Sequence, residues 1–464
     1  MIKERYRAYP EYKDSGGVWL GNVPVHWSTS KIGYLSCKTG SGKTPKGGSE
    51  VYSDDGVLFL RSQNIYDFGL KIDKNDVVFI SDNIDAEMSS SRVLAGDILL
   101  NITGASIGRT CIVPIDFQRA NVNQHVCIIR VPLALQEYVA LCLKSTVTKA
   151  QIDAAQNGAA REGLNFEQLS KIEIALPENK AEQEQIANFL DHETAKIDTL
   201  IEKQQQLIAL LMEKRQAVIS HAVTKGLNPD VPMKHSGVEW LGEVPAHWVV
   251  RRLKHTSKIQ SGIPKGKDLT GKVNISVPML RVANVQDGYL VLDDVHQLEI
   301  EPDQLERYCL EYGDVLMNEG GDNDKLGRGA VWKSDIAPCI HQNHVFAIRP
   351  FSIEPEWLDL LTRSDYAKFH FYRVAKQSTN LASISSTNIK ETPLTIPPKK
   401  ERHEIMEYVF KKLKAFDVTE NKCNGQIQLL SERRTALISA AVTGKIDVRN
   451  WQPPTTPQNS PENQ

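Results

Sequence analysis

The sequence contains no long apolar run and no paired cysteine motif. No stretch approaches the roughly 18 apolar residues of a membrane-spanning helix, and the opening residues MIKERYRAYPEYKD do not form a secretory signal. The seven cysteines are scattered, without a C-x-x-C pair, which argues against both a zinc site and a disulfide framework. These absences predict a cytoplasmic protein without a membrane partner.

An excess of one charge and the common catalytic motifs are also absent. The formal net charge is −2, so a polyanion-binding surface would have to concentrate its positive charge locally. The sequence lacks G-x-S-x-G, H-E-x-x-H and a G-x-G-x-x-G that follows a strand. The stretches IPPK (396–399) and QPPT (452–455) do not fit the motif of amino-methyltransferases. We therefore expect no catalytic residue and no metal site in this chain.

One stretch imitates a nucleotide-binding loop. Residues 38–48 read KTGSGKTPKGG, and Gly42-Lys43-Thr44 resembles the end of a phosphate-binding loop. The full pattern needs another glycine five positions before Gly42, where the chain has Cys37. Pro45 also disfavours a helical conformation at Thr44, where the helix of such a loop would begin. The pattern argues against a nucleotide site, so the loop needs another explanation.

The sequence contains an internal repeat. SGGVWLGNVPVHW (15–27) returns as SGVEWLGEVPAHW (236–248), and GDILLN (96–101) returns as GDVLMN (313–318). EKRQAVISHAVT (213–224) returns as ERRTALISAAVT (432–443), at an offset of 219 residues. A period near 220 residues is too long for a solenoid unit and indicates a duplicated module of domain size.

Each copy has a mixed part and a helical part. The mixed parts, 15–177 and 236–398, are punctuated by Gly, Pro and Asn, and their short aliphatic runs predict strands, for example at 57–60, 97–100 and 126–131. A helical patch is expected at 133–150. The helical parts run from about 178 to 225 and from about 399 to 443, without proline and almost without glycine. The fold class is therefore α+β.

The two helical parts share one heptad frame, which predicts a coiled coil. Both copies place arginine at the same seam position, as Arg215 and Arg434. The alternative is two unrelated amphipathic surface helices, which the shared register disfavours, and Asn424-Gly425 is a weak spot in the second helix. The seam residues of the predicted helix pair are Leu190, Ile197, Ile201, Ile208, Leu211, Val218, Val409, Leu413, Phe416, Ile427, Leu430 and Leu437.

Connectivity predicts how the helices are used. About 45 helical residues span about 67 Å, so the first helix carries the chain from one mixed part to the next. The second helix then most simply runs back antiparallel, which gives a rigid bar with two similar domains related by a pseudo-two-fold axis. The expected divisions are 1–177, 178–226, 227–398 and 399–446, followed by a disordered tail at 447–464 that is rich in Pro, Asn and Gln.

The mixed parts carry loops rich in hydrogen-bond donors, whose residue types pair with base edges and phosphates. The alternative for each residue is an ordinary solvated turn. The matched histidines, His26 with His247 and His125 with His344, are interpreted as structural rather than catalytic, and Trp19 and Trp27 as core or hinge anchors. The candidate DNA-binding residues are Lys43, Thr44, Lys46, Arg61, Gln63, Asn64, Thr103, Ser106 and Arg109 in the first copy, and Lys265, Lys267, Arg281, Asn284, Asp322, Asn323, Lys325 and Arg328 in the second.

Together these motifs resemble the DNA specificity subunit of type I restriction–modification enzymes. The resemblance covers residues 12 to 447 and rests on the order and duplication of the motifs, from the SGKTP loop to the helix ending in RRTALISAAVTG. It implies two target-recognition domains that each read half of a split sequence in double-stranded DNA. It also implies two antiparallel spacer helices that dock two methyltransferase subunits, and restriction–translocase subunits that join the complex.

The resemblance further implies that the subunit is not an enzyme. S-adenosylmethionine, Mg²⁺ and ATP would belong to the partner subunits, and this chain would hold no cofactor. This chain differs from the residues more common in the family at Gly17-Val18 and in the acidic loop 322–324. The bases that the second domain reads can therefore not be inferred from the bases that relatives read. Two alternatives stay open: a coiled-coil adaptor that does not bind DNA, and a nucleotide hydrolase that uses Gly42-Lys43-Thr44.

Overall fold

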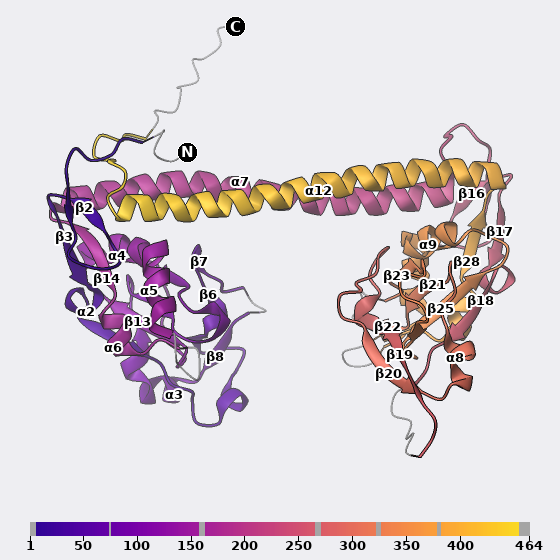
Figure 1. The fold of residues 1–464 in the computed structure, drawn as a ribbon, viewed down its shortest axis with the longest axis horizontal. Helices are drawn as coiled ribbons and strands as arrows, with labels where there is room; N and C mark the ends of the chain where they lie inside the picture. Colours follow the sequence, from indigo (N-terminus) through magenta and orange to yellow (C-terminus); the bar gives the residue numbers. More distant parts are fainter. Residues whose placement is uncertain are drawn as a thin grey trace, which may run out of the picture. The chain divides into compact units, whose positions relative to one another are not determined.

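The structure is a computed structural model that describes residues 6–73, 76–156, 163–264, 271–321, 326–377 and 382–453. Its contacts divide the chain into two units (Figure 1). Unit 1 comprises Met1–Gln204 and Gly425–Gln464, and unit 2 comprises Gln205–Asn424. Each unit holds the mixed part of one sequence copy and a segment of both long helices, α7 (Lys180–Lys225) and α12 (Lys399–Val442). Unlike the predicted divisions, the contact boundaries therefore cut both helices near their middle.

Unit 1 contains two four-stranded sheets. The first has the order β11-β10-β13-β4 and is antiparallel throughout, and the second has the order β8-β5-β12-β9, with β5 and β12 parallel. The predicted strands at 57–60, 97–100 and 126–131 are confirmed as β5, β10 and β13. The strands are β4 (Lys38–Ser41), β5 (Val57–Leu60), β8 (Val78–Ile80), β9 (Arg92–Val93), β10 (Ile98–Asn101), β11 (Thr110–Ile112), β12 (Ala120–Val122) and β13 (Val126–Arg130).

Smaller elements complete unit 1. β1 pairs with β2, β3 with β14, and β6 with β7 in a hairpin. The expected helical patch at 133–150 contains α4 and the start of α5. These elements are β1 (Tyr12–Asp14), β2 (Asn22–Pro24), β3 (Trp27–Lys31), β6 (Ile65–Tyr66), β7 (Gly69–Leu70), β14 (Glu173–Pro177), α2 (Ile32–Leu35), α3 (Asp82–Glu87), α4 (Gln136–Leu143), α5 (Thr146–Gln156) and α6 (Phe166–Ser170).

Unit 2 repeats the four-stranded antiparallel sheet of unit 1, has a three-stranded second sheet, and adds a small sheet of order β22-β27-β26. Its four-stranded sheet has the order β18-β25-β21-β23, and its second sheet has the order β20-β19-β24, with β19 and β24 parallel. The sheet strands are β18 (Ser257–Ser261), β19 (Ile275–Leu280), β20 (His296–Ile300), β21 (Val315–Asn318), β23 (Gly329–Val331), β24 (Ile340–His341) and β25 (Val345–Pro350). The other strands are β15 (Met233–His235), β16 (Glu243–Pro245), β17 (Val249–Arg252), β22 (Gly320–Gly321), β26 (Lys376–Gln377), β27 (Ala382–Ser383) and β28 (Pro393–Ile396). The helices before α12 are α8 (Asp303–Tyr308), α9 (Pro355–Arg363), α10 (Asp365–Val374) and α11 (Ser386–Lys390).

Alternating side chains of the central strands place the core on both faces of each four-stranded sheet. In unit 1, Ile98 and Leu100 of β10 belong to the core shared with α4 and the long helices, whereas Leu99 faces the second sheet. In unit 2, Val315 and Met317 of β21 face the helices and Leu316 faces the other side. Strands buried on both faces read as continuous aliphatic runs, which is why the sequence shows them clearly.

The long helices are α-helical over the predicted ranges, and α12 continues through Gly425 without a break. The helix segments run antiparallel within each unit. In unit 1, Asp198 of α7 meets Arg434 of α12, while Phe189 contacts Trp451 beyond the end of α12. In unit 2, Arg215 meets Asp417.

Every predicted seam residue is buried or half-buried. The buried ones are Leu190, Ile197, Leu211, Val409, Leu413 and Leu437. The half-buried ones are Ile201, Ile208, Val218, Phe416, Ile427 and Leu430. The seam arginines do not face an apolar partner. Arg215 pairs with Asp417 and Glu420, and Arg434 pairs with Asp198, so the shared seam position holds an inter-helix ion pair in both units.

The predicted disordered tail begins too early. Val448, inside the predicted tail, is about 1% exposed and belongs to the core of unit 1. The Trp451 ring packs on Phe189 with a centroid distance of 5.4 Å, and Gln185 Nε2 donates to the Trp451 carbonyl. Composition missed this because a few apolar side chains within a Pro- and Asn-rich stretch are enough to anchor it. Residues 454–464 lie outside the described part of the chain.

Candidate nucleic-acid interface

In each unit, loops that follow four strands meet at one edge of the sheets. In unit 1, the backbone N–H of Asn123 donates to the Leu60 carbonyl (3.0 Å), and the N–H of Gly42 donates to the Asn123 carbonyl (3.1 Å). The N–H of Ile102 donates to the His125 carbonyl (3.0 Å). These bonds bring the ends of β4, β5, β10 and β12 together. We call the segments 42–47, 61–64 and 101–109, and their counterparts 281–284 and 326–328 in unit 2, the loop edge.

The nucleotide-like stretch forms one part of the loop edge. Gly42 is buried against the next loop, and a Cβ at this position would lie 1.5 Å from the Val122 carbonyl oxygen. Gly262 has the same role in unit 2, where a Cβ would lie 2.2 Å from the His341 carbonyl oxygen. The glycine is therefore required for close backbone approach.

No α-helix follows this loop. A short 3-10 helix begins at Gly48, after Gly47 in a left-handed conformation, so the stretch does not fold as a phosphate-binding loop. The side chains of Lys43, Thr44 and Lys46 are exposed.

The turn 61–64 holds its asparagine inside. Asn64 Oδ1 accepts from the Arg61 N–H (2.9 Å), and Asn64 Nδ2 donates to the carbonyls of Lys71 and Asp76 (2.9 and 3.1 Å). In unit 2, Asn284 makes the same bonds to Arg281, Val291 and Asp294. Both asparagines are buried with their amides occupied, which contradicts their assignment as DNA contacts. The asparagine is repeated here because its side-chain amide closes the turn.

The other predicted residues of these turns remain accessible in part. Gln63 is exposed, and Arg61 is half-buried, with Nη2 donating to the Asp76 carbonyl (3.2 Å). Arg281 is half-buried and pairs with Asp294 at 2.8 Å.

The loop 101–109 presents half-buried polar side chains. Thr103 Oγ1 lies 2.6 Å from His125 Nδ1, and Ser106 Oγ accepts from Asn101 Nδ2 (3.0 Å). The Arg109 guanidinium lies over the Tyr66 ring, 4.9 Å from its centroid. The His125 contact agrees with a structural histidine.

Only part of the unit 2 loop edge is described. Arg328 is half-buried, and its Nη1 lies 3.5 Å from Gln286 Oε1. His344 Nδ1 lies 2.8 Å from Glu319 Oε2, so this histidine also has a local partner. The remaining candidates, Lys265, Lys267, Asp322, Asn323 and Lys325, lie outside the described residues.

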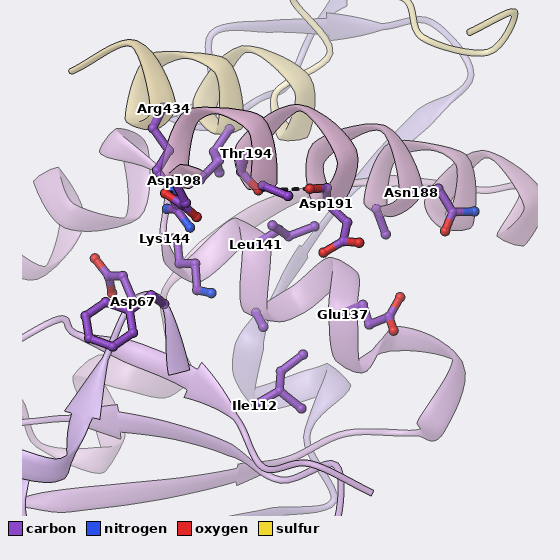
Figure 2. A pocket seen from close by; sticks show the side chains of 15 residues that line it. Asp67, Ile112, Glu137, Leu141, Lys144, Asn188, Asp191, Thr194, Asp198 and Arg434 are labelled. Carbon is purple, nitrogen blue, oxygen red and sulfur yellow. Dashed lines mark hydrogen bonds and ion pairs between the residues drawn. The ribbon is translucent and has the colours of Figure 1, made fainter. Parts of the chain in front are cut away.

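A cleft of about 390 Å³ lies beside the β6–β7 hairpin of unit 1, between α4 and the long helices (Figure 2). Lys144 points into this cleft from the end of α4, near Asp198 and Arg434. Burial and the neighbouring Arg434 lower the pKa of Lys144. This lysine was not singled out from the sequence, because Lys144 belongs to no recognisable motif.

The matched histidines 26 and 247 belong to a cluster at the start of each long helix. Trp27 Nε1 donates to Glu182 Oε1 (3.0 Å), and His26 Nε2 lies 2.9 Å from Glu182 Oε2. In unit 2, Trp248 and His247 contact Glu401 at 3.1 and 2.7 Å.

In these clusters the partner of the histidine is a helix carboxylate and not the loop that the sequence had predicted. Trp27 and Trp248 are fully buried, whereas Trp19 is 40% exposed and is not a core residue. The two glutamates were missed, although their shared offset of 219 (401 minus 182) could have revealed them.

The described residues hold no group of three or more potential metal ligands, and none of the described helices is long and apolar enough to cross a membrane. What the loop edge offers is basic and amide side chains on a rigid scaffold. Such groups can contact phosphates and base edges.

Comparison with known proteins identifies the family. The type I restriction modification DNA specificity domain matches residues 24–209 and again residues 245–429. The specificity subunit of the EcoKI type I restriction enzyme of Escherichia coli K12 is 24% identical over 413 residues, covering 86% of this chain and 84% of the relative. The StySPI specificity subunit of Salmonella potsdam is 23% identical over 440 residues, covering 93% and 91%.

A solved structure shares the fold. It comes from a study of the complex assembly and conformational transition of the type I R-M system, with a TM-score of 0.59 and 16% identity, covering 91% of this chain and 99% of that one. Most of both mixed parts and most of both long helices lie within the matched ranges. The chain therefore belongs to the type I restriction–modification DNA specificity family and carries its domain twice.

Proposed function

We propose that this chain is the non-catalytic subunit that selects a bipartite site in double-stranded DNA. Each unit reads one half-site with its loop edge, and the paired helices set the number of unread base pairs between the half-sites. One observation carries this proposal. The two copies keep the same four-stranded antiparallel sheet, the same close-approach glycine and the same buried asparagine, while the accessible side chains beside the asparagine differ, as Gln63 and Ala283 do.

The chemistry of the loop edge divides into two tasks. Lysines such as Lys43 and Lys46 contact phosphates, which positions the domain without specifying sequence. Polar side chains such as Gln63, Thr103 and Ser106 belong to the same loop edge, are at least partly accessible, and can reach base edges in the major groove. Arg109 and Arg328 lie against the hairpin that follows the turn and support its position.

The long helices also provide a surface for protein partners. Exposed apolar side chains occur on α7, including Leu200, Leu210 and Met212, and on α12, including Leu429. We assign this surface to two methyltransferase subunits, with restriction–translocase subunits joining the complex. S-adenosylmethionine, Mg²⁺ and ATP then act in those partners, in the cytoplasm, and the methyltransferase flips the target adenine out of the duplex.

The test is methylation with the cognate methyltransferase. We expect the mixture to methylate adenines at one bipartite sequence, detected by single-molecule sequencing, and neither component to act alone. One added helical turn in α7 between Lys203 and Leu211, matched by one in α12 between Cys423 and Ile427, should widen the spacer and leave both half-sites unchanged. A change in the half-site bases after this insertion would refute the proposal that the paired helices set only the spacer.

Phosphate contact by the loop edge has its own test. Lys43→Ala should weaken binding and reduce the slope of log K against log salt concentration by about 1. Lys13→Ala, on the β1–β2 hairpin, is the matched control. Unchanged duplex binding by Lys43→Ala would remove this loop from the interface. Absence of any duplex binding in the presence of the methyltransferase would favour a coiled-coil adaptor instead.

A further inference from the structure

The two units differ in how the mixed part is tied to the long helices. Both share one bond. In unit 1 the Thr146 N–H at the start of α5 donates to Ser439 Oγ of α12 (2.8 Å), and in unit 2 the Asp365 N–H at the start of α10 donates to Ser220 Oγ of α7 (2.8 Å). The other polar contacts between the mixed part and the long helices differ between the two units.

Unit 2 has a network of ion pairs at the tip of the hairpin that follows the turn 281–284. Asp287 accepts from Arg363 Nε at the end of α9 (2.7 Å) and pairs with Lys368 of α10 (3.3 Å). Arg363 also pairs with Asp359 at 3.2 Å, and its side chain is only 7% exposed. Burial alone would raise the pKa of Asp287, but Arg363 and Lys368 lower it overall, so this carboxyl group is ionised at neutral pH.

The network continues onto the long helix α7. Lys368 Nζ donates to Gln216 Oε1 (2.8 Å), and Gln216 Nε2 donates to the Arg363 carbonyl (2.7 Å). We call Gln216, Asp287, Arg363 and Lys368 the polar clasp. It joins the hairpin tip, the α9–α10 junction and α7 through hydrogen bonds to charged groups.

A glycine makes the clasp possible. Gly288 has φ +86°, and a Cβ at this position would lie 2.4 Å from Arg363 Nη1. The guanidinium therefore rests directly on the backbone of the hairpin tip. In addition, the Gly288 N–H donates to the Gly329 carbonyl (2.8 Å), which ties the tip to the residue after Arg328.

Unit 1 lacks the clasp, although the same positions exist. Phe68 replaces Gly288, Ala140 replaces Asp359, Lys144 replaces Arg363 and Thr435 replaces Gln216. Asp67, the counterpart of Asp287, still pairs with Lys149 at 3.4 Å.

Unit 1 has no counterpart, among its described residues, of the hydrogen bonds that Gln216 of α7 makes in unit 2. The Thr435 hydroxyl donates to the Ser431 carbonyl of its own helix. Within the described part of the chain the Lys144 side chain makes no hydrogen bond or ion pair, and Figure 2 shows this side chain in the open cleft.

We propose that the polar clasp is a positioning device for the second target-recognition domain, which fixes its loop edge relative to α7 and so limits the spacer lengths that the subunit accepts. The inference rests on the proposed function. The turn 281–284 lies three residues before Asp287, and Gln286 between them contacts Arg328, so movement of the hairpin tip moves both parts of the loop edge. Gln216, Asp287, Arg363 and Lys368 act as positioning residues and do not themselves touch DNA in this proposal.

The experiment uses the full chain with its cognate methyltransferase on DNA libraries that keep both half-sites and vary the spacer. Asp287→Asn and Gln216→Ala should raise methylation at spacers one base pair too short or too long, relative to the native spacer, by about tenfold. The half-site bases should stay the same. Asp67→Asn and Thr435→Ala, at the matched positions of unit 1, should change this ratio by less than about twofold.

Two further variants separate positioning from simple loss of stability. Asp287→Glu keeps the charge and should restore most of the native spacer preference. Building the clasp in unit 1 with Phe68→Gly, Ala140→Asp, Lys144→Arg and Thr435→Gln should narrow spacer tolerance below that of the natural chain. Melting temperatures of all variants show whether they are folded.

The outcomes are distinct. An equal effect of the unit 1 and unit 2 variants, or an unchanged spacer ratio in folded Gln216→Ala, would overturn the clasp proposal. If the natural chain itself directs no methylation to a bipartite site, the proposed function fails rather than the clasp.

Discussion

At the scale of single residues, repeated sequence in this chain has two different causes. Asn64 and Asn284 are repeated because each holds a turn closed from inside, and Gly42 and Gly262 because no Cβ fits. The exposed residues next to the asparagines vary between the copies, as Gln63 and Ala283 do. Residue identity between repeats therefore marks the scaffold, and residue difference marks the candidate reading surface.

The close-approach glycine gives a direct prediction. Gly42→Ala should lower the free energy of unfolding by about 3 kcal/mol, because the new methyl group would overlap the Val122 carbonyl. Gly40→Ala, two residues earlier with no atom within 4 Å of the added Cβ, is the control and should be nearly neutral. Thermal and denaturant unfolding measure the difference, and similar losses for the two variants would contradict the steric explanation.

Asp359 predicts a pH dependence of unit 2. Burial raises the pKa of Asp359 to about 6, above its ordinary value of 3.8, although Arg363 acts in the opposite direction. A carboxyl group whose pKa is raised by folding binds its proton more tightly in the folded state. Its contribution to stability is therefore largest below pH 4 and is lost as the pH rises through about 6.

The comparison is between the natural chain and Asp359→Asn, which cannot titrate. The free energy of unfolding of the natural chain, relative to this variant, should increase by up to about 3 kcal/mol between pH 7 and pH 4. Asp293→Asn, which removes an exposed carboxyl group of the same unit, should show no comparable trend. A pH-independent difference for Asp359→Asn would show that the buried carboxyl does not titrate in this range.

At the scale of elements, the long helices are stabilised by tertiary contacts more than by their own sequence. α12 contains Gly425 at an exposed position where no atom lies within 4 Å of an added Cβ, so the helix continues there against a poor intrinsic preference. Ion pairs between the helices, Arg215 with Asp417 and Arg434 with Asp198, lie at the shared seam position. The weak spot seen in the sequence therefore lies within a continuous helix.

Gly425→Ala should stabilise the chain by about 0.5–1 kcal/mol, because alanine restricts the unfolded chain and fits the helix. Ala415→Gly, at another exposed position of α12, should destabilise by a similar amount. Denaturant titrations followed by circular dichroism at 222 nm compare the two. Destabilisation by Gly425→Ala would show that a kink at this glycine is needed.

At the scale of the whole molecule, the sequence repeat and the contact units are not the same thing. Ile219, Ala222 and Val223 belong to the first sequence copy but fill the core of unit 2. Leu437, Ile438 and Ala441 belong to the second copy but fill the core of unit 1. Each mixed part is therefore completed by a helix end from the other copy.

A cut in the backbone between α7 and β15 tests this exchange. Residues 227–230 are exposed, so a protease site inserted there can be cleaved in the folded chain. We expect the two fragments to stay together in size-exclusion chromatography, because the end of α7 remains packed in unit 2. Ile219→Asp together with Ile438→Asp, which disrupts both exchanged helix ends, should release them, whereas Glu213→Asp, on an exposed face of α7, should not. Separation of the unsubstituted fragments on cleavage would contradict the exchange.

The sequence alone determined the duplication, the mixed fold, the long helices, their shared heptad frame and the family. These features follow from local propensity and periodicity, which repeat at a fixed offset and can be read without coordinates. The tertiary structure decided which polar side chains are free. Asn64 and Gln63 are neighbours in the sequence, yet one is buried and the other exposed. It also decided that Ile446, Val448 and Trp451 pack on the core of unit 1. It decided, too, that the clasp forms in unit 2 and not at the matched, described positions of unit 1, because both features depend on contacts between residues far apart in the chain.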